Sequence, residues 1–466
     1  MLDIRIGAKA EFDYPRDAIL AQHVNNILKD LAYSNPKYED AQRLGFSTFG
    51  IPREIKTYGV STTPSGTVIT FARGELHRFL NAPFPVNIIE EFPEITHLPN
   101  ITYENTEFDL DERQERCVKA ILNKKQGVIH AATSAGKSAI LMRAITERKV
   151  RAIIVVHRKI LLEQLLTDAR RWLRNCTIGV LQSTSRREGE ELPDILFTID
   201  KTLALTLRQN PARISGVGLI IQDEAHLAAT STFQNIIGNS SIHFRYGLTG
   251  TVKRKDRMQF LLFATFGPII ATVSKDELEE AGRTTPVETI VHETNTTAPD
   301  EVFELSSTKQ WQALDKIVHE DEGRLSQARK IVYDILHSHS NARVLVVSRY
   351  VEPAKRIFEQ LGKSGISCGL VTGQEKENSQ TCQDLEDGKI QVIVATIGVV
   401  STGVNIKSLT DLILFSPIFS NELLLHQLRG RCMRVSPGKE KAYMHLMYDA
   451  NLWPGRIGRV LSILRR

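Results

Sequence analysis

The 466-residue chain is poor in cysteine and contains no long apolar stretch. Its five cysteines are odd in number and form no Cys-x-x-Cys pair, which argues for a reducing compartment and against a structural zinc site. No apolar run approaches the roughly 20 residues that span a bilayer, and the first residues lack the pattern of a secretory signal. We therefore expect a cytoplasmic protein with no membrane partner.

A strong net charge is also missing, because the formal net charge of the whole chain is only +5. The positive charge is concentrated in two segments, 143–174 and 421–466, which each hold nine basic and three acidic residues. Local basic patches suit a polyanionic partner. Solvated Lys and Arg on an ordinary surface are the simpler explanation of such clusters.

The length predicts two to four domains, since a domain commonly holds about 100–200 residues. Residues 1–100 combine a segment of helical spacing, 15–33, with a predicted hairpin at 57–71. They form a candidate N-terminal accessory domain of α+β type. Four prolines between residues 83 and 99 mark a linker out of it.

The hairpin region is locally basic and contains Tyr58, Phe71 and Phe79. A basic hairpin with aromatic residues could bind nucleic acid by stacking. The same aromatic residues could form the core of the small domain, and we favour this second interpretation.

After the linker, short apolar runs alternate with helical segments in two blocks. Buried strands alternating with helices predict a parallel sheet over residues 105–285 and another over 326–466. Residues 286–325 are polar and lose this rhythm, so we interpret them as a connector. The fold class is α/β, with two parallel-sheet domains in tandem behind a small α+β domain. The expected strands are 127–131, 151–156, 178–181, 194–198, 217–221 and 246–249, then 343–347, 367–371, 391–395, 411–415 and 442–447.

A strand, a loop of small residues and a helix are predicted to meet at Ala131–Ser138, which reads Ala-Ala-Thr-Ser-Ala-Gly-Lys-Ser. In a phosphate-binding loop, backbone N–H groups surround the anion, the lysine reaches the terminal phosphates and the serine hydroxyl holds Mg²⁺. The usual first glycine is Ala131 here, and an ordinary helix start with a surface lysine is the alternative for this segment alone. The nucleotide-binding candidates are Thr133, Ser134, Ala135, Gly136, Lys137 and Ser138.

A second motif, Asp223-Glu224-Ala225-His226, follows an apolar run 86 residues after Lys137. An Asp at the carboxyl end of a strand can hold the Mg²⁺ that bridges the phosphates. The adjacent Glu can orient and deprotonate the attacking water. A solvated acidic turn is the alternative for the tetrapeptide alone. With the phosphate-loop motif upstream, the pair predicts hydrolysis of a bound nucleotide, with Asp223 and Ser138 as Mg²⁺ ligands and Glu224 as the catalytic residue.

Together these motifs resemble those of the superfamily 2 helicases and translocases. The resemblance covers about residues 105–450, and the motifs occur in the family's order. It implies two RecA-like domains, ATP and Mg²⁺ as cofactors, and a nucleic-acid partner. The segment Leu110–Gln114 looks like the family's adenine-reading element, with Gln114 in the reader's place.

Other segments resemble the family's nucleic-acid motifs. Val155–Lys159 and Phe197–Leu203 are similar to two strand-end motifs of the first domain, and Gly247–Thr251 is similar to the coupling motif. Val346–Arg349 and Ala395–Asn405 are similar to second-domain motifs, although many relatives carry Asp at the position of Asn405. From the residues alone, each side chain could equally be polar surface at a strand end. The resemblance implies nucleic-acid contacts at His157, Arg158, Thr198, Lys201, Ser348, Arg349 and Thr402, and a nucleotide contact at Gly403.

The most specific segment of the second block is His426–Arg434. Gln427, Arg431 and Arg434 share one face of a predicted helix, since they are spaced i, i+4 and i+7. A solvated basic helix is the alternative on spacing alone. The pattern Gln-x-x-Gly-Arg-x-x-Arg resembles the family's arginine-finger helix, which implies that Arg431 and Arg434 reach the γ-phosphate and that Gln427 belongs to the catalytic set. An arginine finger can be worth about 10³–10⁵ in rate.

Within the superfamily, the chain looks most like the phage UvsW-type helicases and the RecG-like branch-migration helicases. The features shared are the phosphate loop, the Asp-Glu-Ala-His (DEAH) box, Leu-Thr-Gly-Thr and a compact N-terminal domain. This resemblance implies an ATP-dependent helicase that acts on forked or branched DNA in replication, recombination or repair. The alternatives are an RNA helicase, because phosphate contacts do not identify the sugar, an ATPase that clamps nucleic acid without unwinding it, and the motor of a restriction complex, for which the chain shows no nuclease motif.

Overall fold

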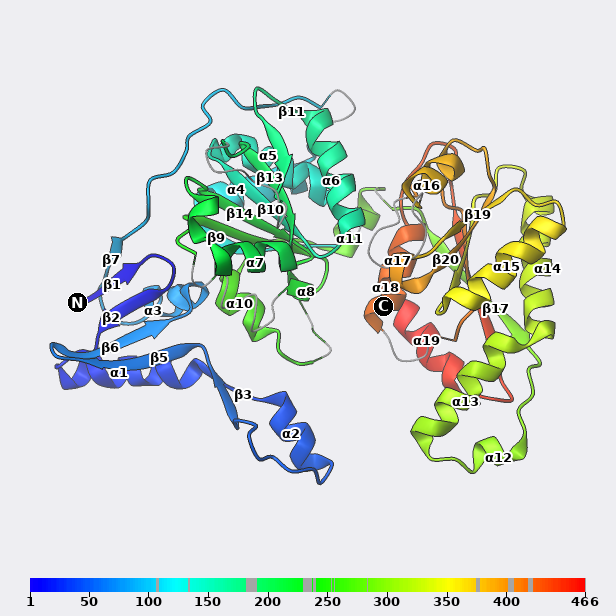
Figure 1. The fold of residues 1–466 in the computed structure, drawn as a ribbon, viewed down its shortest axis with the longest axis horizontal. Coiled ribbons are helices and arrows are strands. Elements are labelled where there is room, and N and C mark those ends of the chain that lie inside the picture. Colours follow the sequence, from blue (N-terminus) through cyan, green and yellow to red (C-terminus); the bar gives the residue numbers. More distant parts are fainter. Residues whose placement is uncertain are drawn as a thin grey trace. The chain divides into compact units, whose positions relative to one another are not determined.

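The computed structural model of the chain divides into two units, Met1–Ser274 and Lys275–Arg466. The first contains the N-terminal domain and one parallel sheet, and the second contains the other parallel sheet (Figure 1). No helix in the described residues of either unit is long and apolar enough to cross a membrane. The described residues are 1–105, 109–132, 135–181, 191–228, 237, 240–252, 254, 256–282, 284–373, 378–400, 406–417 and 422–465.

The N-terminal domain is built on a mixed sheet with the strand order β5-β6-β2-β1-β7. Phe12, Phe71 and Phe79 are almost fully buried in its core, and Tyr58 packs against them. The interpretation of the hairpin aromatics as core residues is therefore confirmed. Helix α1 (Ala18–Asp30) contributes to the same core. The strands are β1 (Leu2–Ile6), β2 (Ala10–Asp13), β5 (Tyr58–Thr63), β6 (Gly66–Phe71) and β7 (Val86–Glu90).

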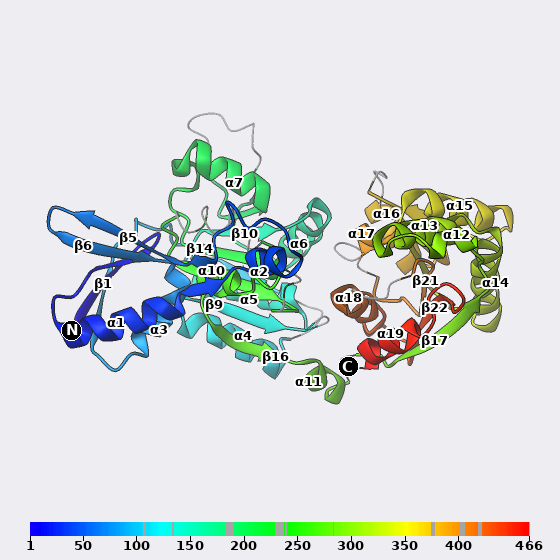
Figure 2. The ribbon, with the colours of Figure 1, turned by 90° about the horizontal axis from the view of Figure 1, so that it is seen from below.

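The predicted hairpin at 57–71 is also confirmed, because β5 and β6 pair antiparallel over their whole length (Figure 2). A short 3₁₀ helix η1 (Arg73–Glu75) and helix α3 (Leu76–Leu80) then lead to β7. Beyond it, β8 (Thr102–Tyr103) pairs with β11 (Leu173–Arg174).

Residues 32–56 form an arm that leaves the sheet of the N-terminal domain, drawn in dark blue in Figure 1. Its base is the antiparallel pair β3 (Ala32–Ser34) and β4 (Glu54–Lys56). Helix α2 (Pro36–Arg43) follows β3, and the loop 44–53 returns the chain to β4.

The parallel sheet of the first unit has the strand order β12-β13-β10-β14-β15-β9-β16. The six strands expected from the sequence are present, since apolar runs such as Ala152–Val156 are buried throughout. Strand β16 (Ile269–Val273), which the sequence analysis does not include, pairs with β9 at the edge. The other strands are β9 (Gln126–Ala131), β10 (Ala152–Val156), β12 (Ile178–Val180), β13 (Ile195–Ile199), β14 (Leu219–Asp223) and β15 (Phe244–Thr249).

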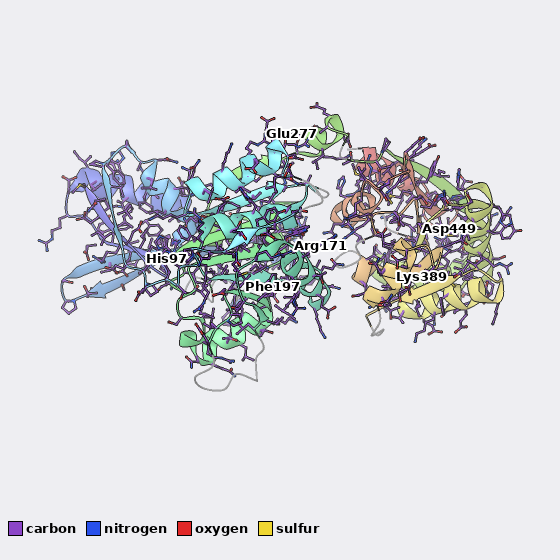
Figure 3. The ribbon with its side chains drawn as sticks, turned by 90° about the horizontal axis from the view of Figure 1, so that it is seen from above. His97, Arg171, Phe197, Glu277, Lys389 and Asp449 are labelled. Atoms are coloured by element: carbon purple, nitrogen blue, oxygen red, sulfur yellow. The ribbon has the colours of Figure 1, made fainter. Side chains whose placement is uncertain are left out.

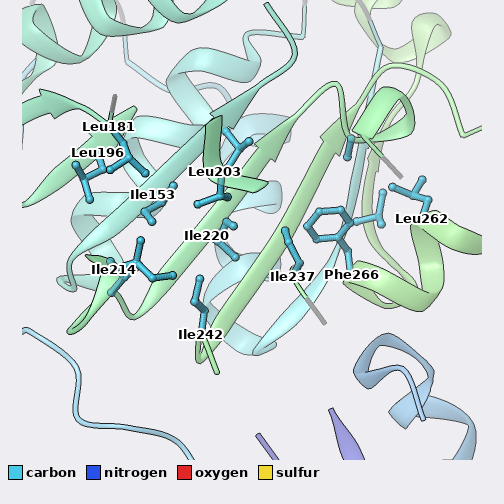
Figure 4. Packing of buried hydrophobic residues seen from close by; sticks show 14 of the residues in the cluster. Ile153, Leu181, Leu196, Leu203, Ile214, Ile220, Ile237, Ile242, Leu262 and Phe266 are labelled. Atoms are coloured by element: carbon cyan, nitrogen blue, oxygen red, sulfur yellow. The ribbon is translucent and has the colours of Figure 1, made fainter. Parts of the chain in front are cut away.

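Helices pack against this sheet and close its core. One buried cluster joins Ile153 and Ile220 of the strands with Leu203 and Phe266 of the helices (Figure 4). The helices are α4 (Glu112–Asn123), α5 (Lys137–Arg148), α6 (Lys159–Trp172), α7 (Asp200–Gln209), η2 (Pro211–Ile214), α8 (Ala225–Ala228) and α10 (Phe260–Phe266).

The parallel sheet of the second unit has the strand order β17-β22-β21-β18-β20-β19. The five strands expected from the sequence are again present. Strand β17 (Val287–Thr294) is a correction, because it lies in the segment 286–325 interpreted as a connector, yet it pairs with β22 over its full length. The other strands are β18 (Val344–Ser348), β19 (Cys368–Val371), β20 (Val392–Thr396), β21 (Asp411–Leu414) and β22 (Ala442–Asp449).

Helix α14 is anchored to this second sheet by a buried ion pair. Arg324, 1% exposed, donates to the carbonyl oxygens of Phe415 (2.6 Å) and Met447 (2.9 Å) and to the carboxylate of Asp449, labelled in Figure 3. Burial lowers the pKa of Arg324 to about 10, so the guanidinium stays charged at neutral pH. The helices of the unit are α11 (Lys275–Glu280), α12 (Asp300–Phe303), α13 (Ser307–Glu320), α14 (Glu322–Ser338), α15 (Val351–Lys363), α16 (Asn378–Glu386), α17 (Ile397–Val400), α18 (Glu422–Cys432) and α19 (Arg456–Arg465).

Replacement of the buried carboxylate should strongly destabilise the second unit. We expect Asp449→Ala to lower its free energy of unfolding by about 3–5 kcal/mol, because Arg324 is left charged and buried without its acid. Urea denaturation of the variant measures this loss. Lys441→Ala is the control, since Lys441 directly precedes β22, and its exposed pair with Glu288 of β17 should be worth about 1 kcal/mol or less. Equal losses in both variants would contradict the assignment.

Buried arginines join the N-terminal domain to the first parallel sheet. Arg73, 3% exposed, donates to the side-chain oxygen of Gln126 (2.9 Å) and to the carbonyl oxygens of Ile242 (2.8 Å) and His243. Arg245 reaches back in the opposite direction and donates to the carbonyl oxygen of Ala8 (3.0 Å). Within the first unit, the domain is therefore held through charged hydrogen bonds as well as apolar packing.

The chain also makes a close backbone approach at this contact. A Cβ atom at Gly74 would lie 2.1 Å from the carbonyl oxygen of Phe263 and 2.5 Å from that of Ala264. Only glycine allows η1 to lie this close to α10.

A side chain at this approach should disrupt the contact between the two parts of the first unit. We expect Gly74→Ala to lower the free energy of unfolding by about 1–3 kcal/mol, because backbone atoms cannot move aside as flexible side chains do. Urea denaturation again gives the value. Gly362→Ala, in a helix with open space around it, should leave stability unchanged or raise it by up to about 1 kcal/mol.

Candidate active site

Three neighbouring parallel strands, β14, β15 and β9, bring the chemical motifs of the first unit to one edge of the sheet. In the register, Asp223 lies opposite Leu248, and Thr249 lies opposite His130. Parallel strands end at the same edge, so the segments that follow β9, β14 and β15 emerge together. These segments contain the phosphate-loop motif, Asp223-Glu224 and Thr249–Thr251.

The start of α5 has the backbone expected at an anion site. Gly136 has φ +75° and no side-chain cap, so the first N–H groups of α5 are not covered by a capping side chain. Ala131 and Ala135 are buried, which shows that small residues line the loop. Two of the nucleotide-binding candidates, Thr133 and Ser134, lie outside the described residues.

Lys137 and Glu224 form an ion pair between the loop and the acidic motif, with 2.8 Å between Nζ and Oε1. Both side chains are partly exposed, at 18% and 25%. Glu224 also has φ +47°, in the left-handed region that a non-glycine residue seldom adopts. Strained backbone of this kind concentrates at functional sites.

The buried carboxylate of Asp223 lies next to this pair. Burial, reinforced by the charge of Glu224, raises the pKa of Asp223 to about 6, and the charge of Lys137 opposes the rise. Its Oδ1 atom has no hydrogen-bond partner among the residues that the structure describes. A buried carboxylate oxygen without a donor fits a cation ligand.

Whether Asp223 can hold a cation depends on the other ligands that are available near it. The described residues contain no group of three or more His, Cys, Asp or Glu that could hold a metal ion by themselves. A Mg²⁺ ion that binds with a nucleotide usually needs only one or two protein oxygens, because phosphates and water complete its shell. Asp223, with Ser138 in the first turn of α5, fits that requirement.

A hydrogen bond links the acidic motif to the segment after β15. The Nδ1 atom of His226 lies 2.8 Å from the hydroxyl of Thr249, which donates to the carbonyl oxygen of Thr251 (2.7 Å). Burial lowers the pKa of His226 to about 4, so its ring is neutral at pH 7. The Asp-Glu-Ala-His motif is thus tied to Thr249-Gly250-Thr251 through a fixed, uncharged bond.

Gln114 contacts the phosphate loop directly, since its Nε2 donates to the carbonyl oxygen of Ala135 (3.1 Å). Its Oε1 accepts from the backbone N–H of Asp111 (3.0 Å), and the Asp111 carboxylate accepts from the N–H of Gln114, a capping box at the start of α4. Sequence analysis missed the role of Asp111, although an Asp three residues before a Gln carries that signal.

The nucleic-acid candidates of the first unit differ in exposure. Arg158 and Lys201 are exposed, and His157 pairs with Asp200 at 3.2 Å. Thr198 is fully buried, and its hydroxyl lies 3.4 Å from the carbonyl oxygen of Leu181. In this conformation Thr198 is a residue of the sheet interior with no surface for a nucleic acid.

Burial and internal hydrogen bonds also limit the nucleic-acid candidates of the second unit. Ser348 is fully buried. Arg349 donates to the carboxylate of Asp315 (2.9 Å) and to the carbonyl oxygen of Pro417 (2.8 Å), so internal contacts orient its guanidinium. Asp315, a buried residue of α13, is a partner that sequence analysis missed. The candidates Thr402 and Gly403 lie outside the described residues.

Helix α18 carries Gln427 and Arg431 but ends at Cys432, so the prediction that Arg434 lies on the same helical face is wrong. Leu425, Leu428 and Cys432 are buried, whereas Gln427 and Arg431 are half-buried on another face of the helix. Arg434 follows the helix end. Burial, with a further contribution from the charge of Arg431, lowers the pKa of Arg434 to about 9, which leaves Arg434 mainly protonated at neutral pH.

Comparison with protein families gives two matches along the chain. The family described as "Type III restriction enzyme, res subunit" matches residues 107–254, and the family described as "Helicase conserved C-terminal domain" matches residues 327–436. Together the two ranges take in more than half of the chain.

Curated relatives carry helicase names. The chain is 25% identical over 349 residues to "ATP-dependent DNA helicase uvsW" of Enterobacteria phage T4, across 72% of this chain and 68% of the relative. It is 28% identical over 246 residues to "Probable helicase D10" of Escherichia phage T5, across half of each protein. Among solved structures, T4 UvsW matches with 19% identity and a TM-score of 0.43, across 96% of this chain and 90% of that one.

A side chain at Gly136 should disturb the nucleotide site. In Gly136→Ala, the new Cβ would lie 2.2 Å from Nε2 of Gln114 on a backbone with φ +75°. A left-handed conformation costs a non-glycine residue about 1–2 kcal/mol, so we expect about tenfold weaker binding of a fluorescent ATP analogue. Comparison of Gln114→Ala/Gly136→Ala with Gln114→Ala alone isolates the backbone strain, since neither variant has the clash and both lack the Gln114 side chain. Undiminished binding by Gly136→Ala would contradict this geometry.

Proposed function

The chain belongs to the superfamily 2 helicases and hydrolyses ATP, and from this premise we propose that it is an ATP-dependent DNA helicase that acts on forked or branched DNA. The two RecA-like units and the helicase names of its relatives support the enzyme class. The word DNA in the name of the T4 relative, which aligns with 72% of this chain, favours DNA over RNA. The preference for branched substrates rests on the resemblance to UvsW-type helicases.

The observation that carries the proposed chemistry is the 2.8 Å ion pair between Lys137 and Glu224 beside Asp223, whose Oδ1 atom is buried. A nucleotide phosphate would compete with the Glu224 carboxylate for the ammonium group of Lys137. Once released from this pair, Glu224 can accept a proton from an attacking water. Nucleotide binding and activation of the base are therefore coupled through one lysine.

The remaining roles follow from charge and position. Asp223 and Ser138 would hold Mg²⁺, which neutralises phosphate charge when it is bound. The backbone N–H groups around Ala135 and Gly136 would bind the phosphate oxygens. Arg431 and Arg434 would stabilise the negative charge that develops on the γ-phosphate, and Gln427, which lies on α18 with Arg431, would act with them.

Substitution of Lys137 and Glu224 tests their separate roles in nucleotide binding and in hydrolysis. We expect Lys137→Ala to lose ATP binding and strand separation together. Glu224→Gln should still bind ATP but hydrolyse it about 10²–10⁴ times more slowly, because the general base is removed while the site keeps its shape. ATP-analogue binding and phosphate release measure the two effects separately, with Lys441→Ala as a distant control. Fork separation by Lys137→Ala would contradict the phosphate-loop assignment.

A panel of substrates tests the nucleic acid. We expect strand displacement and ATP turnover with forked and four-way DNA to exceed those with single-stranded DNA, blunt duplex and forked RNA. Equal stimulation by RNA and DNA would refute the DNA assignment. ATP consumption on a fork without strand displacement would instead favour a clamp. Turnover that increases with the length of an unbranched duplex would favour a translocating motor, a possibility included because one matching family is named after a restriction subunit.

A further inference from the structure

The tip of the arm exposes large apolar side chains close together. Phe49 is 96% exposed, Phe46 is 68% exposed and Leu44 is 59% exposed, all in the loop after α2. Single exposed apolar residues are ordinary on protein surfaces. Three within six consecutive residues form a patch, and exposed apolar patches mark interaction sites.

Hydrogen bonds and two glycines fix the shape of this loop. The N–H groups of Gly45 and Phe46 donate to the carbonyl oxygens of Gln42 (3.3 Å) and Ala41 (2.8 Å), the two bonds of a Schellman cap, with φ +72° at Gly45. The loop therefore turns away from α2 at a defined angle with Phe46 directly after the turn.

A tight turn presents the second phenylalanine. The N–H of Ile51 donates to the carbonyl oxygen of Thr48 (3.0 Å), with Phe49 and Gly50 at the two central positions and φ +76° at Gly50. Glycine at the third position of such a turn is the signature of type II geometry. Phe49 stands at the apex, where the turn leaves its ring in solvent.

The base of the arm and its helix α2, by contrast, are fixed to the part of the first unit that contains the parallel sheet. The ring of Tyr33 stacks on Phe260 with centroids 4.2 Å apart and an interplanar angle of 8°. Arg257 pairs with Glu39 (3.1 Å) and Asp40 (2.8 Å) of α2. The tip therefore occupies a defined place relative to the parallel sheet that bears the phosphate loop.

The charged residues around the tip indicate what kind of partner it binds. The acidic residues of α2 are neutralised by Arg257, and Asp40 also pairs with Arg43. Across the loop, Arg53 and Lys56 are exposed beside a single acid, Glu54. Aromatic rings flanked by cations match the two faces of a nucleic-acid strand, which offers bases for stacking and phosphates for ion pairing.

We propose that the tip of the arm, residues 44–50, is a base-stacking surface that binds unpaired nucleotides of a DNA fork through Phe46 and Phe49. This proposal rests on the proposed function and adds a second point of DNA contact outside the helicase motifs. Because the base of the arm is fixed, a stacked nucleotide is held at a constant position relative to the first parallel sheet. The arm thus holds an unpaired strand while the ATP-driven cycle proceeds.

The test uses the full chain without ATP and a DNA fork with 2-aminopurine in its unpaired arm. Stacking on an aromatic ring quenches this base, so binding of the unaltered protein should lower its fluorescence. We expect Phe46→Ala/Phe49→Ala to lose this quenching and to bind the fork at least about tenfold more weakly, with unchanged affinity for a blunt duplex and an unchanged melting temperature. Ile19→Ala is the matched control, because Ile19 is 70% exposed on α1 of the same domain.

A charge variant separates phosphate contact from stacking. Arg53→Gln should keep the quenching but reduce by about one unit the slope of log affinity against log salt concentration.

The proposal would be overturned if the double phenylalanine variant kept the quenching and the fork affinity of the unaltered protein. A change in sedimentation mass without loss of DNA binding would also overturn it, because the tip would then bind a second copy. If the unaltered protein neither binds forks nor hydrolyses ATP, the proposed function itself fails, whereas fork unwinding without quenching refutes the arm alone.

Discussion

The parallel register of the first sheet is the constraint on which the candidate site depends. Lys137 and Glu224 are 87 residues apart in the chain, yet they form a 2.8 Å ion pair. The pair exists because β9, β15 and β14 are neighbours that run in one direction, so the segments after them emerge at one edge. The buried Asp223 and the His226–Thr249 bond lie at the same edge for the same reason. No local sequence feature alone would bring these groups together.

The central strands and the edge strands β12 and β19 could be predicted from the sequence, whereas the edge strands β16 and β17 were missed. A central strand such as Val344–Ser348 is covered on both faces, buried throughout and apolar up to Ser348. Strand β16 was missed although its residues are largely apolar. Strand β17 lies at a sheet edge and is largely half-buried, so its residues need not be apolar. His292-Glu293-Thr294 therefore resembles a loop, although it belongs to β17.

Side-chain environments were predicted less well than strands. The phosphate loop and the acidic motif were identifiable because their chemistry requires particular residues. Motif resemblance alone could not show that Thr198 and Ser348 are buried, or that Asp315 of α13 orients Arg349, which follows β18. Those facts depend on tertiary contacts between distant segments. Similarly, composition does not separate the core residue Phe71 from Phe49, which the glycine turn of the arm exposes.

The arginine contact between the N-terminal domain and the first sheet has a consequence for synthesis of the chain. Arg73 is buried against the carbonyl oxygens of Ile242 and His243, which lie about 170 residues further along. At roughly 5–20 residues per second, a ribosome needs about 10–30 s to make that interval. During this time the nascent domain has its own apolar core but exposes a cation without its final partners. The N-terminal domain therefore docks late on the first parallel sheet, and Arg73 stays solvated by water until β15 emerges from the ribosome.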